Sequence, residues 1–173
     1  GSKDATFTVT PDSDSIKEAD ATSSITATVS SNAGEIENPV VNAGTLTVTD
    51  SKDTTTVTVG TANVNEDATS ATVTVKLEGH TFKTGETVTV TLADGTKVDF
   101  TENGSKDATF TVTPDSDSIK DSTTSDITAT VSSSAGDIEK PVVNAGTLTV
   151  EDSINTTTVT VGNTTVNEDA TSA

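Results

Sequence analysis

The stretch TVTVTLADGTKVDF at Thr87–Phe100 predicts two β-strands joined by a tight turn. On both sides of Ala93-Asp94-Gly95, apolar residues alternate with threonine or charged residues. A period of two places the apolar side chains on one face of a strand and the polar side chains on the other. An Asp-Gly pair between two such runs is a hairpin signal. We therefore expect an antiparallel hairpin with one buried face and one hydrated face.

The same alternation recurs on both sides of this hairpin, and no stretch carries a helical apolar period over three turns. It predicts further strands at Thr54–Val59, Thr72–Leu77, Ala108–Thr113, Asp126–Ser132 and Thr147–Glu151. About seven short strands in roughly 100 residues are typical of an immunoglobulin-like sandwich. The predicted fold is therefore an all-β, Ig-like antiparallel β-sandwich, and a closed barrel is the alternative.

The chain also repeats itself with a period of about 100 residues, which is a whole domain rather than a solenoid repeat of 20 to 50 residues. Four strings return unchanged: Gly1–Lys17 at Gly104–Lys120, Pro39–Val48 at Pro141–Val150, Thr54–Gly60 at Thr156–Gly162, and Val64–Ala71 at Val166–Ala173. Near-identical tandem repeats serve length, reach or avidity. Catalysis needs only one good site, so we do not expect an enzyme.

The strand pattern sets the expected domain boundaries. Residues 54–155 form one complete Ig-like repeat, residues 1–53 form the C-terminal half of a preceding repeat, and residues 156–173 form the first strand and loop of a following one. An alternative register, Gly1–Asn103, needs a circularly permuted strand order. Neither half closes a sandwich alone, so end-to-end or strand-exchange contacts between neighbouring molecules are a further expectation.

Composition limits the partners and the source of stability. The net charge is −18, only 30% of residues are hydrophobic, and cysteine is absent. The acidic balance excludes nucleic acid, which needs clustered lysine and arginine, and it argues against direct membrane contact. The thin core and the lack of disulfides leave a bound metal as the remaining support. Carboxylates favour Ca²⁺, whereas Zn²⁺ needs cysteine or histidine.

An up-and-down strand order gathers acidic loops at the ends of the repeat, where neighbouring carboxylates repel one another unless a cation lies between them. We expect Ca²⁺ at these poles and at the linkers between repeats. The predicted ligands are Asp115, Asp117, Glu66, Asp67 and Asp152, with Asp12, Asp14 and Asp50 at the preceding junction and Asp53 as an extra linker acid. The alternative is that these acids are solvated and only keep the protein soluble.

His80 is the single histidine and follows Gly79 in a predicted loop. No serine, cysteine or second histidine accompanies it, so no nucleophile–base set is present. We expect His80 to be a surface residue.

The order of TVTVTLADGTKVDF at Thr87–Phe100, ATFTVTPDSDS at Ala108–Ser118 and VVNAGTLTVEDS at Val142–Ser153 resembles the extender repeats of giant bacterial RTX adhesins. The resemblance covers the whole chain. It implies a Ca²⁺-stabilised Ig-like fold, type I secretion, and a location outside the cell on a parent protein anchored in the outer membrane. Ions would lie within repeats and at linkers, here at Asp115, Asp117, Asp152 and the loop at Glu66.

Two functions follow from this reading. The first is a structural spacer, monomeric within a long array, whose partners are neighbouring repeats and which projects a distal ligand-binding region. The second is an adhesive module that itself binds a glycan, ice or a protein. The absence of Trp and Tyr argues against a sugar site, while outward rows of threonine leave ice binding open.

Overall fold

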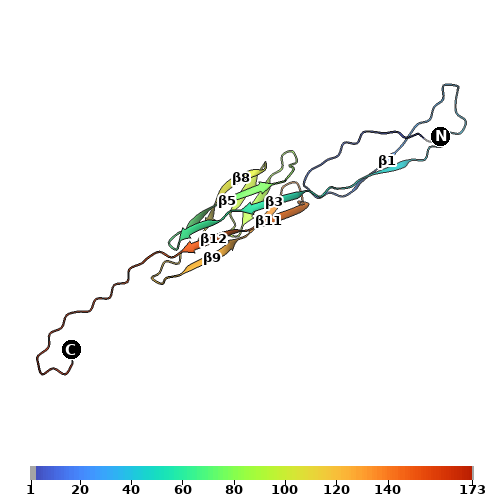
Figure 1. The fold of residues 1–173 in the computed structure, drawn as a ribbon. Coiled ribbons are helices and arrows are strands. Elements are labelled where there is room, and N and C mark those ends of the chain that lie inside the picture. Colours follow the sequence, from blue (N-terminus) through green and yellow to red (C-terminus); the bar gives the residue numbers. More distant parts are fainter. Residues whose placement is uncertain (1–2, 173) are drawn as a thin grey trace.

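The computed structural model describes residues 3–172, and within them the fold is all-β, with no helix. Strands in the N-terminal part are β1 (Ala21–Ile25) and β2 (Gly44–Val48). The central part holds β3 (Thr54–Val59), β4 (Ala62–Asn65), β5 (Ser70–Glu78), β6 (Val88–Leu92), β7 (Lys97–Phe100), β8 (Gly104–Thr111), β9 (Ser122–Ile127), β10 (Ala129–Ser133), β11 (Lys140–Asn144) and β12 (Gly146–Glu151). Figure 1 shows β3–β12 gathered into one elongated body.

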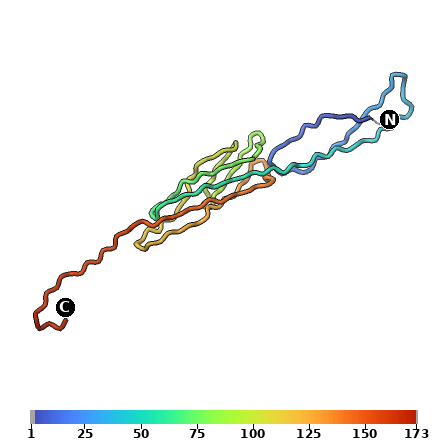
Figure 2. The backbone as a smooth tube through the Cα atoms, viewed as in Figure 1, coloured from blue at the N-terminus to red at the C-terminus, as the bar shows by residue number. Residues whose placement is uncertain are grey.

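The body contains three small sheets, ordered β11-β3-β5-β8, β10-β6-β7 and β4-β12-β9. A separate two-stranded sheet pairs β1 with β2, from Ala21↔Val48 to Ile25↔Gly44. The N-terminal segment leaves the body at one end, and the extended segment after β12 leaves at the other (Figure 2). The two termini therefore lie far apart along the long axis.

One cluster of buried side chains joins the three sheets of the body. The buried positions of β5 alternate strictly, as Ala71, Val73, Val75 and Leu77. They lie in the same cluster as the buried residues of β3, β6, β7, β9 and β12, including the fully enclosed Phe100 and Ile127. Threonine fills most of the outward positions, so apolar burial is confined to one face of each strand.

The alternation correctly predicted β3, β5, β6, β7, β8 and β12, with boundaries shifted by a few residues in most of them. The predicted strand Asp126–Ser132 is instead the end of β9 and most of β10, which belong to different sheets. Two strands of the body, β4 and β11, were not predicted, and neither were β1 and β2 of the N-terminal part. Neither β4 nor β11 is deeply buried on one face, so neither shows a strong apolar period.

The expectation of purely antiparallel pairing is wrong at two places. β11 runs parallel to β3, from Lys140↔Thr54 to Asn144↔Thr58, and β12 runs parallel to β4, from Leu148↔Ala62 to Glu151↔Asn65. The two chain segments cross together from one sheet to the next at Gly60 and Gly146. A Cβ on Gly146 would lie 2.0 Å from the Gly60 carbonyl oxygen, so this crossing needs glycine.

Candidate metal centres

Two groups of acidic side chains come close enough to hold a metal ion. The C-terminal cluster consists of Glu66, Asp121 and Asp152, and the N-terminal cluster consists of Asp12, Asp14 and Glu18. In each cluster, one carboxylate oxygen from every residue lies within 4.8 Å of the others. Oxygen donors at this spacing suit a hard cation.

Strand register positions the C-terminal cluster. β12 lies between β4 and β9, with Glu151 opposite both Asn65 and Ser122. Each acid lies one residue beyond this row: Glu66 after β4, Asp152 after β12 and Asp121 before β9. The backbone N–H of Glu66 also donates to the Glu151 carbonyl at 2.9 Å. Three distant parts of the sequence therefore meet at one end of this sheet, where its strands begin or stop.

Glu66 is the most enclosed member of the C-terminal cluster, at 2% exposed. Its Oε1 accepts hydrogen bonds from Ser153 Oγ at 2.6 Å and from Asn155 Nδ2 at 3.4 Å. Its Oε2 is buried and has no hydrogen-bond partner among residues 3–172. An unpartnered buried carboxylate oxygen is costly, and a cation bound there would remove that cost.

The acids of the C-terminal cluster also affect one another. Partial desolvation raises the pKa of Asp121, and the charges of Asp117, Asp115, Glu66 and Asp152 raise it further. The N–H of Asp115 donates to the Glu66 carbonyl at 3.1 Å, so the loop that carries Asp115 lies against the cluster. Among the described residues, no lysine forms an ion pair with it.

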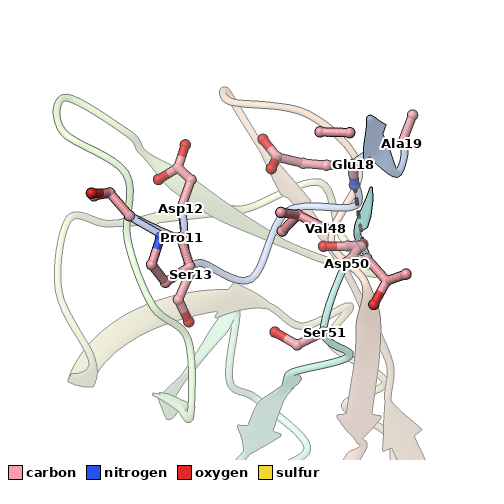
Figure 3. Close-up of a pocket in the computed structure, with 11 residues that line it drawn as sticks. Pro11, Asp12, Ser13, Glu18, Ala19, Val48, Asp50 and Ser51 are labelled. Atoms are coloured by element: carbon pink, nitrogen blue, oxygen red, sulfur yellow. Dashed lines mark hydrogen bonds between the residues drawn. The ribbon is translucent and has the colours of Figure 1, made fainter. Parts of the chain in front are cut away.

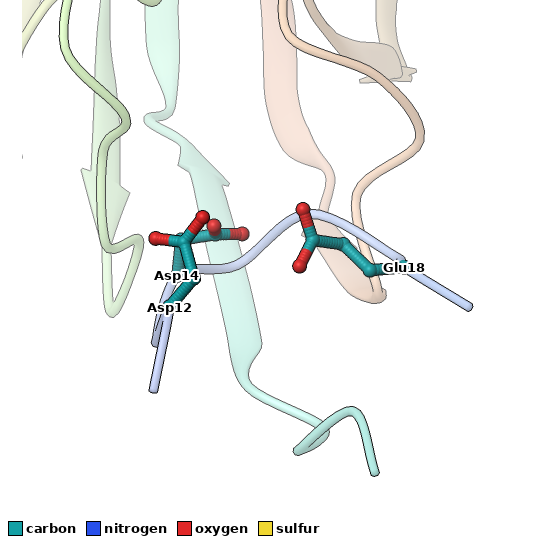
Figure 4. Close-up of side chains that lie close together, drawn as sticks. All are labelled: Asp12, Asp14 and Glu18. Carbon is teal, nitrogen blue, oxygen red and sulfur yellow. The ribbon is translucent and has the colours of Figure 1, made fainter. Parts of the chain in front are cut away.

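The N-terminal cluster lies on a single loop, as Figure 4 shows. Asp14 is buried, and its Oδ1 accepts a hydrogen bond from the Ile16 N–H at 2.7 Å. Lys83 of the body supplies a counter-ion: its Nζ lies 3.1 Å from Asp14 Oδ2 and donates to Glu18 Oε1. Hydrogen bonds to Glu18 and then Asp14 raise the pKa of Lys83, against the effect of its partial burial.

Asp50 lies beside the N-terminal cluster and accepts a hydrogen bond from the Glu18 N–H at 3.2 Å. Asp12, Glu18 and Asp50 line the same hollow, together with Val48 and Ser51 (Figure 3). Under the sequence repeat, Asp12, Asp14, Glu18 and Asp50 correspond to Asp115, Asp117, Asp121 and Asp152. Glu18 and Asp121 are therefore the members that the two clusters share by repeat position, and Asp50 borders the N-terminal cluster where Asp152 belongs to the C-terminal one.

The predicted ligands are distributed around these clusters. Glu66 and Asp152 lie in the C-terminal cluster, and Asp12 and Asp14 lie in the N-terminal cluster. Asp115 and Asp117 act on the C-terminal cluster through their charge, and Asp50 borders the N-terminal one. The remaining two, Asp67 and Asp53, belong to neither cluster; Asp67 is exposed, and the Asp53 N–H donates to Glu139 Oε2.

The sequence reasoning missed Glu18 and Asp121. They occupy the same position in the two copies, and they are both carboxylates although the residue type differs. The residues that follow them differ as well, as Ala-Asp in one copy and Ser-Thr in the other. The retained carboxylate beside changing neighbours was the signal that could have identified them.

Glu139 forms part of a third acidic contact. Burial raises its pKa, the hydrogen bond from the Asp53 N–H lowers it, and the neighbouring charges of Asp50 and Asp53 raise it again, so that the net shift is upward. Its Oε1 is buried without a hydrogen-bond partner.

His80 is buried, which corrects the prediction that it is a surface residue. It is 3% exposed; its Nδ1 lies 2.8 Å from Thr55 Oγ1, and its Nε2 lies 2.9 Å from Glu86 Oε1. Burial alone would raise the pKa of Glu86, but hydrogen bonds from Ser133, the Lys83 N–H and His80 bring it below its ordinary value. These contacts tie the loop after β5 to β3 and β10.

No protein-family model matches this chain, and a comparison with curated proteins found no match. Within residues 3–172, no helix is long and apolar enough to cross a membrane.

Proposed function

We propose that this chain is a structural spacer of a secreted bacterial adhesin, in which Ig-like β-sandwich repeats are stiffened by Ca²⁺. The shared core of the three sheets supports a sandwich of about 100 residues. The elongated shape, with the two terminal segments at opposite ends of the body, suits units joined end to end (Figure 1). As a spacer of a secreted adhesin, the protein would act outside the cell and without catalysis, and its partners would be neighbouring repeats.

The observation that carries the cation part of this proposal is the buried, unpartnered Oε2 of Glu66. Asp121 and Asp152 each bring a carboxylate oxygen within 4.8 Å of an oxygen of Glu66, and their like charges destabilise the folded state unless a cation lies among them. All three donors are carboxylates, which favours Ca²⁺ over Zn²⁺. Ca²⁺ also tolerates the irregular geometry of ligands that come from different segments.

Stiffening follows from where the C-terminal cluster lies. Glu66 already contacts Ser153 and Asn155, which begin the segment that leaves the body. A cation bound by Glu66, Asp121 and Asp152 would cross-link the end of the sheet β4-β12-β9 to the start of that segment. Bending at this junction would then require breaking cation–oxygen bonds, so the junction becomes stiffer when the ion is bound.

The test is a calcium titration of this chain that follows the melting temperature and, by small-angle X-ray scattering, the maximum dimension. We expect both to rise as Ca²⁺ reaches about 10⁻⁴ to 10⁻³ M, the range of extracellular calcium modules. Excess EDTA should reverse both changes. A melting temperature and a particle length that do not respond to Ca²⁺ would refute the proposal.

A further inference from the structure

A four-residue segment of the N-terminal part, Asp14–Lys17, packs against the body. Its third residue, Ile16, is 3% exposed and forms an antiparallel β-bridge with Ile138. A Cβ on Gly136 would lie 2.9 Å from Ile16 Cγ2, so the hollow that receives Ile16 has no spare room. We name Asp14–Lys17 the docking segment.

The docking segment is held by backbone hydrogen bonds to two loops of the body. The Ser15 N–H donates to the Thr81 carbonyl at 3.2 Å, and the Thr81 N–H donates to Ser15 Oγ at 2.9 Å. On the other side, the Lys17 N–H donates to the Asp137 carbonyl at 2.7 Å, and the Glu139 N–H donates to the Ser15 carbonyl at 3.1 Å. We name Thr81–Lys83 with Gly136–Glu139 the receiving surface.

Charge reinforces the contact. Lys83 of the receiving surface reaches Asp14 of the docking segment and the adjoining Glu18. The receiving loop is itself braced, because Glu86 Oε2 accepts the Lys83 N–H at 2.7 Å while Glu86 Oε1 faces the buried His80. The Thr81–Lys83 part of the receiving surface is therefore held by contacts within the body.

The same four residues, Asp-Ser-Ile-Lys, recur at Asp117–Lys120, where all four are exposed. Ile119 is 66% exposed, against 3% for Ile16. The local turn is nevertheless present in both copies, since Asp117 Oδ1 accepts the Ile119 N–H at 2.5 Å as Asp14 Oδ1 accepts the Ile16 N–H. The second segment is thus pre-shaped for a contact that it does not make within the described residues.

We infer that Asp117–Lys120 docks onto the receiving surface of a second copy of this unit, as Asp14–Lys17 docks onto the body here. Ile119 would fill the hollow beside Gly136 of that copy, and Asp117 and Asp121 would meet its Lys83. The choice of a second copy as the partner rests on the proposed spacer role. The contact itself consists of an isoleucine, backbone hydrogen bonds and a lysine, and therefore needs no metal.

The experiment uses disulfide capture, which is clean because the chain has no cysteine. One chain carries Ile119→Cys. The other carries Ile138→Cys to mark the receiving surface and Ile16→Asp to free it. Ile16 is not part of the core cluster of the body, so the second chain should stay folded. The control replaces Ile119→Cys by Ile154→Cys, at a side chain that is 96% exposed.

We expect the mixed disulfide to form about tenfold faster with Ile119→Cys than with Ile154→Cys, because docking raises the local thiol concentration. Restoring Ile16 in the second chain should remove that advantage, since its own docking segment then fills the site. Equal rates for the two cysteines would overturn the inference.

Running the capture in Ca²⁺ and in EDTA separates this inference from the spacer proposal. Capture in both media, from a chain whose melting temperature ignores Ca²⁺, would keep the docking contact and refute calcium stiffening. A calcium-dependent melting temperature without selective capture would support calcium stiffening and refute the docking contact.

Discussion

Glu66 and Glu168 occupy the same place in two identical stretches of sequence, yet only Glu66 is buried. The difference comes from their surroundings: Glu66 follows a paired strand, whereas Glu168 lies in an exposed segment without strands. A buried carboxylate is unfavourable alone and favourable beside a cation. The sign of its contribution to stability therefore depends on the medium.

We predict that Glu66→Gln lowers the melting temperature in saturating Ca²⁺ and leaves it unchanged or higher in EDTA. Loss of the carboxylate removes a ligand in the first medium and an uncompensated charge in the second. Glu168→Gln is the matched control and should shift neither melting curve. Calorimetry in the two media measures this, and an equal loss in both would remove Glu66 from the site.

Glu86 has a different role, because its partners are hydrogen-bond donors rather than other acids. We predict that Glu86→Ala lowers the free energy of unfolding by about 3 kcal/mol, since His80, Ser133 and the Lys83 N–H all lose their acceptor. The exposed Glu102→Ala should cost under about 0.5 kcal/mol. Urea denaturation, monitored by circular dichroism, measures the free energy of unfolding of both variants. Similar losses for the two variants would contradict the role of Glu86 as a shared hydrogen-bond acceptor.

At the scale of elements, context also decides whether a strand forms. The string TTTVTV is β3 at Thr54–Val59, between β11 and β5, but at residues 156–161 the identical string forms no strand. Val57 is fully buried, whereas Val159 is 83% exposed. A strand with one apolar face is stable only when neighbouring strands and a core receive that face.

We therefore predict that the same substitution is costly at one of two equivalent positions and nearly neutral at the other. Val57→Ala should destabilise the body by about 2 kcal/mol, through lost burial and the cavity that remains. Val159→Ala should change the free energy of unfolding by less than about 0.5 kcal/mol. Chemical denaturation gives both values, and a large cost at Val159 would mean that residues 156–161 pack against a surface in solution.

The sequence predicts where strands lie and which of their residues are buried, but not which strands pair. Alternation marks which residues of β5 or β6 are buried, because a period of two is a local property. It does not specify which strands are neighbours, so the parallel pairs β11/β3 and β12/β4 were missed. The C-terminal cluster was predicted only in part for the same reason, since Asp121 reaches Glu66 and Asp152 through the register of β9 on β12.

At the scale of the whole molecule, a net charge of −18 combines with an elongated shape. Acidic groups gather near both ends of the body. An elongated particle keeps the two acidic ends farther apart than a sphere would. Two of these acids, Asp121 and Glu139, have raised pKa values, in both cases first through desolvation and further through neighbouring charges. Protonation of these two groups should therefore favour the folded state.

The pH dependence of stability without metal follows from this sign. A carboxyl group whose pKa is higher in the folded state binds protons more tightly there, so the free energy of unfolding rises as pH falls through that folded pKa. The rise is complete near the ordinary values of 3.8 for Asp121 and 4.5 for Glu139. Glu86 and Asp94 have the opposite effect, because their hydrogen bonds outweigh burial and lower their pKa. Below the ordinary values, protonation of these two groups lowers the free energy of unfolding.

In EDTA we therefore predict a melting temperature that increases as the pH falls from neutrality toward about 4.5 and decreases in stronger acid. Saturating Ca²⁺ should remove the part of the increase that comes from Asp121, because protons then compete with the cation for the same oxygens. Asp121→Asn should make the increase in EDTA smaller, and the contribution of Glu139 should remain. The exposed Glu102→Gln should leave the whole increase in place. Melting curves across this pH range decide the matter: a steady decline from neutrality in EDTA would show that the acids do not repel one another enough to destabilise the folded state.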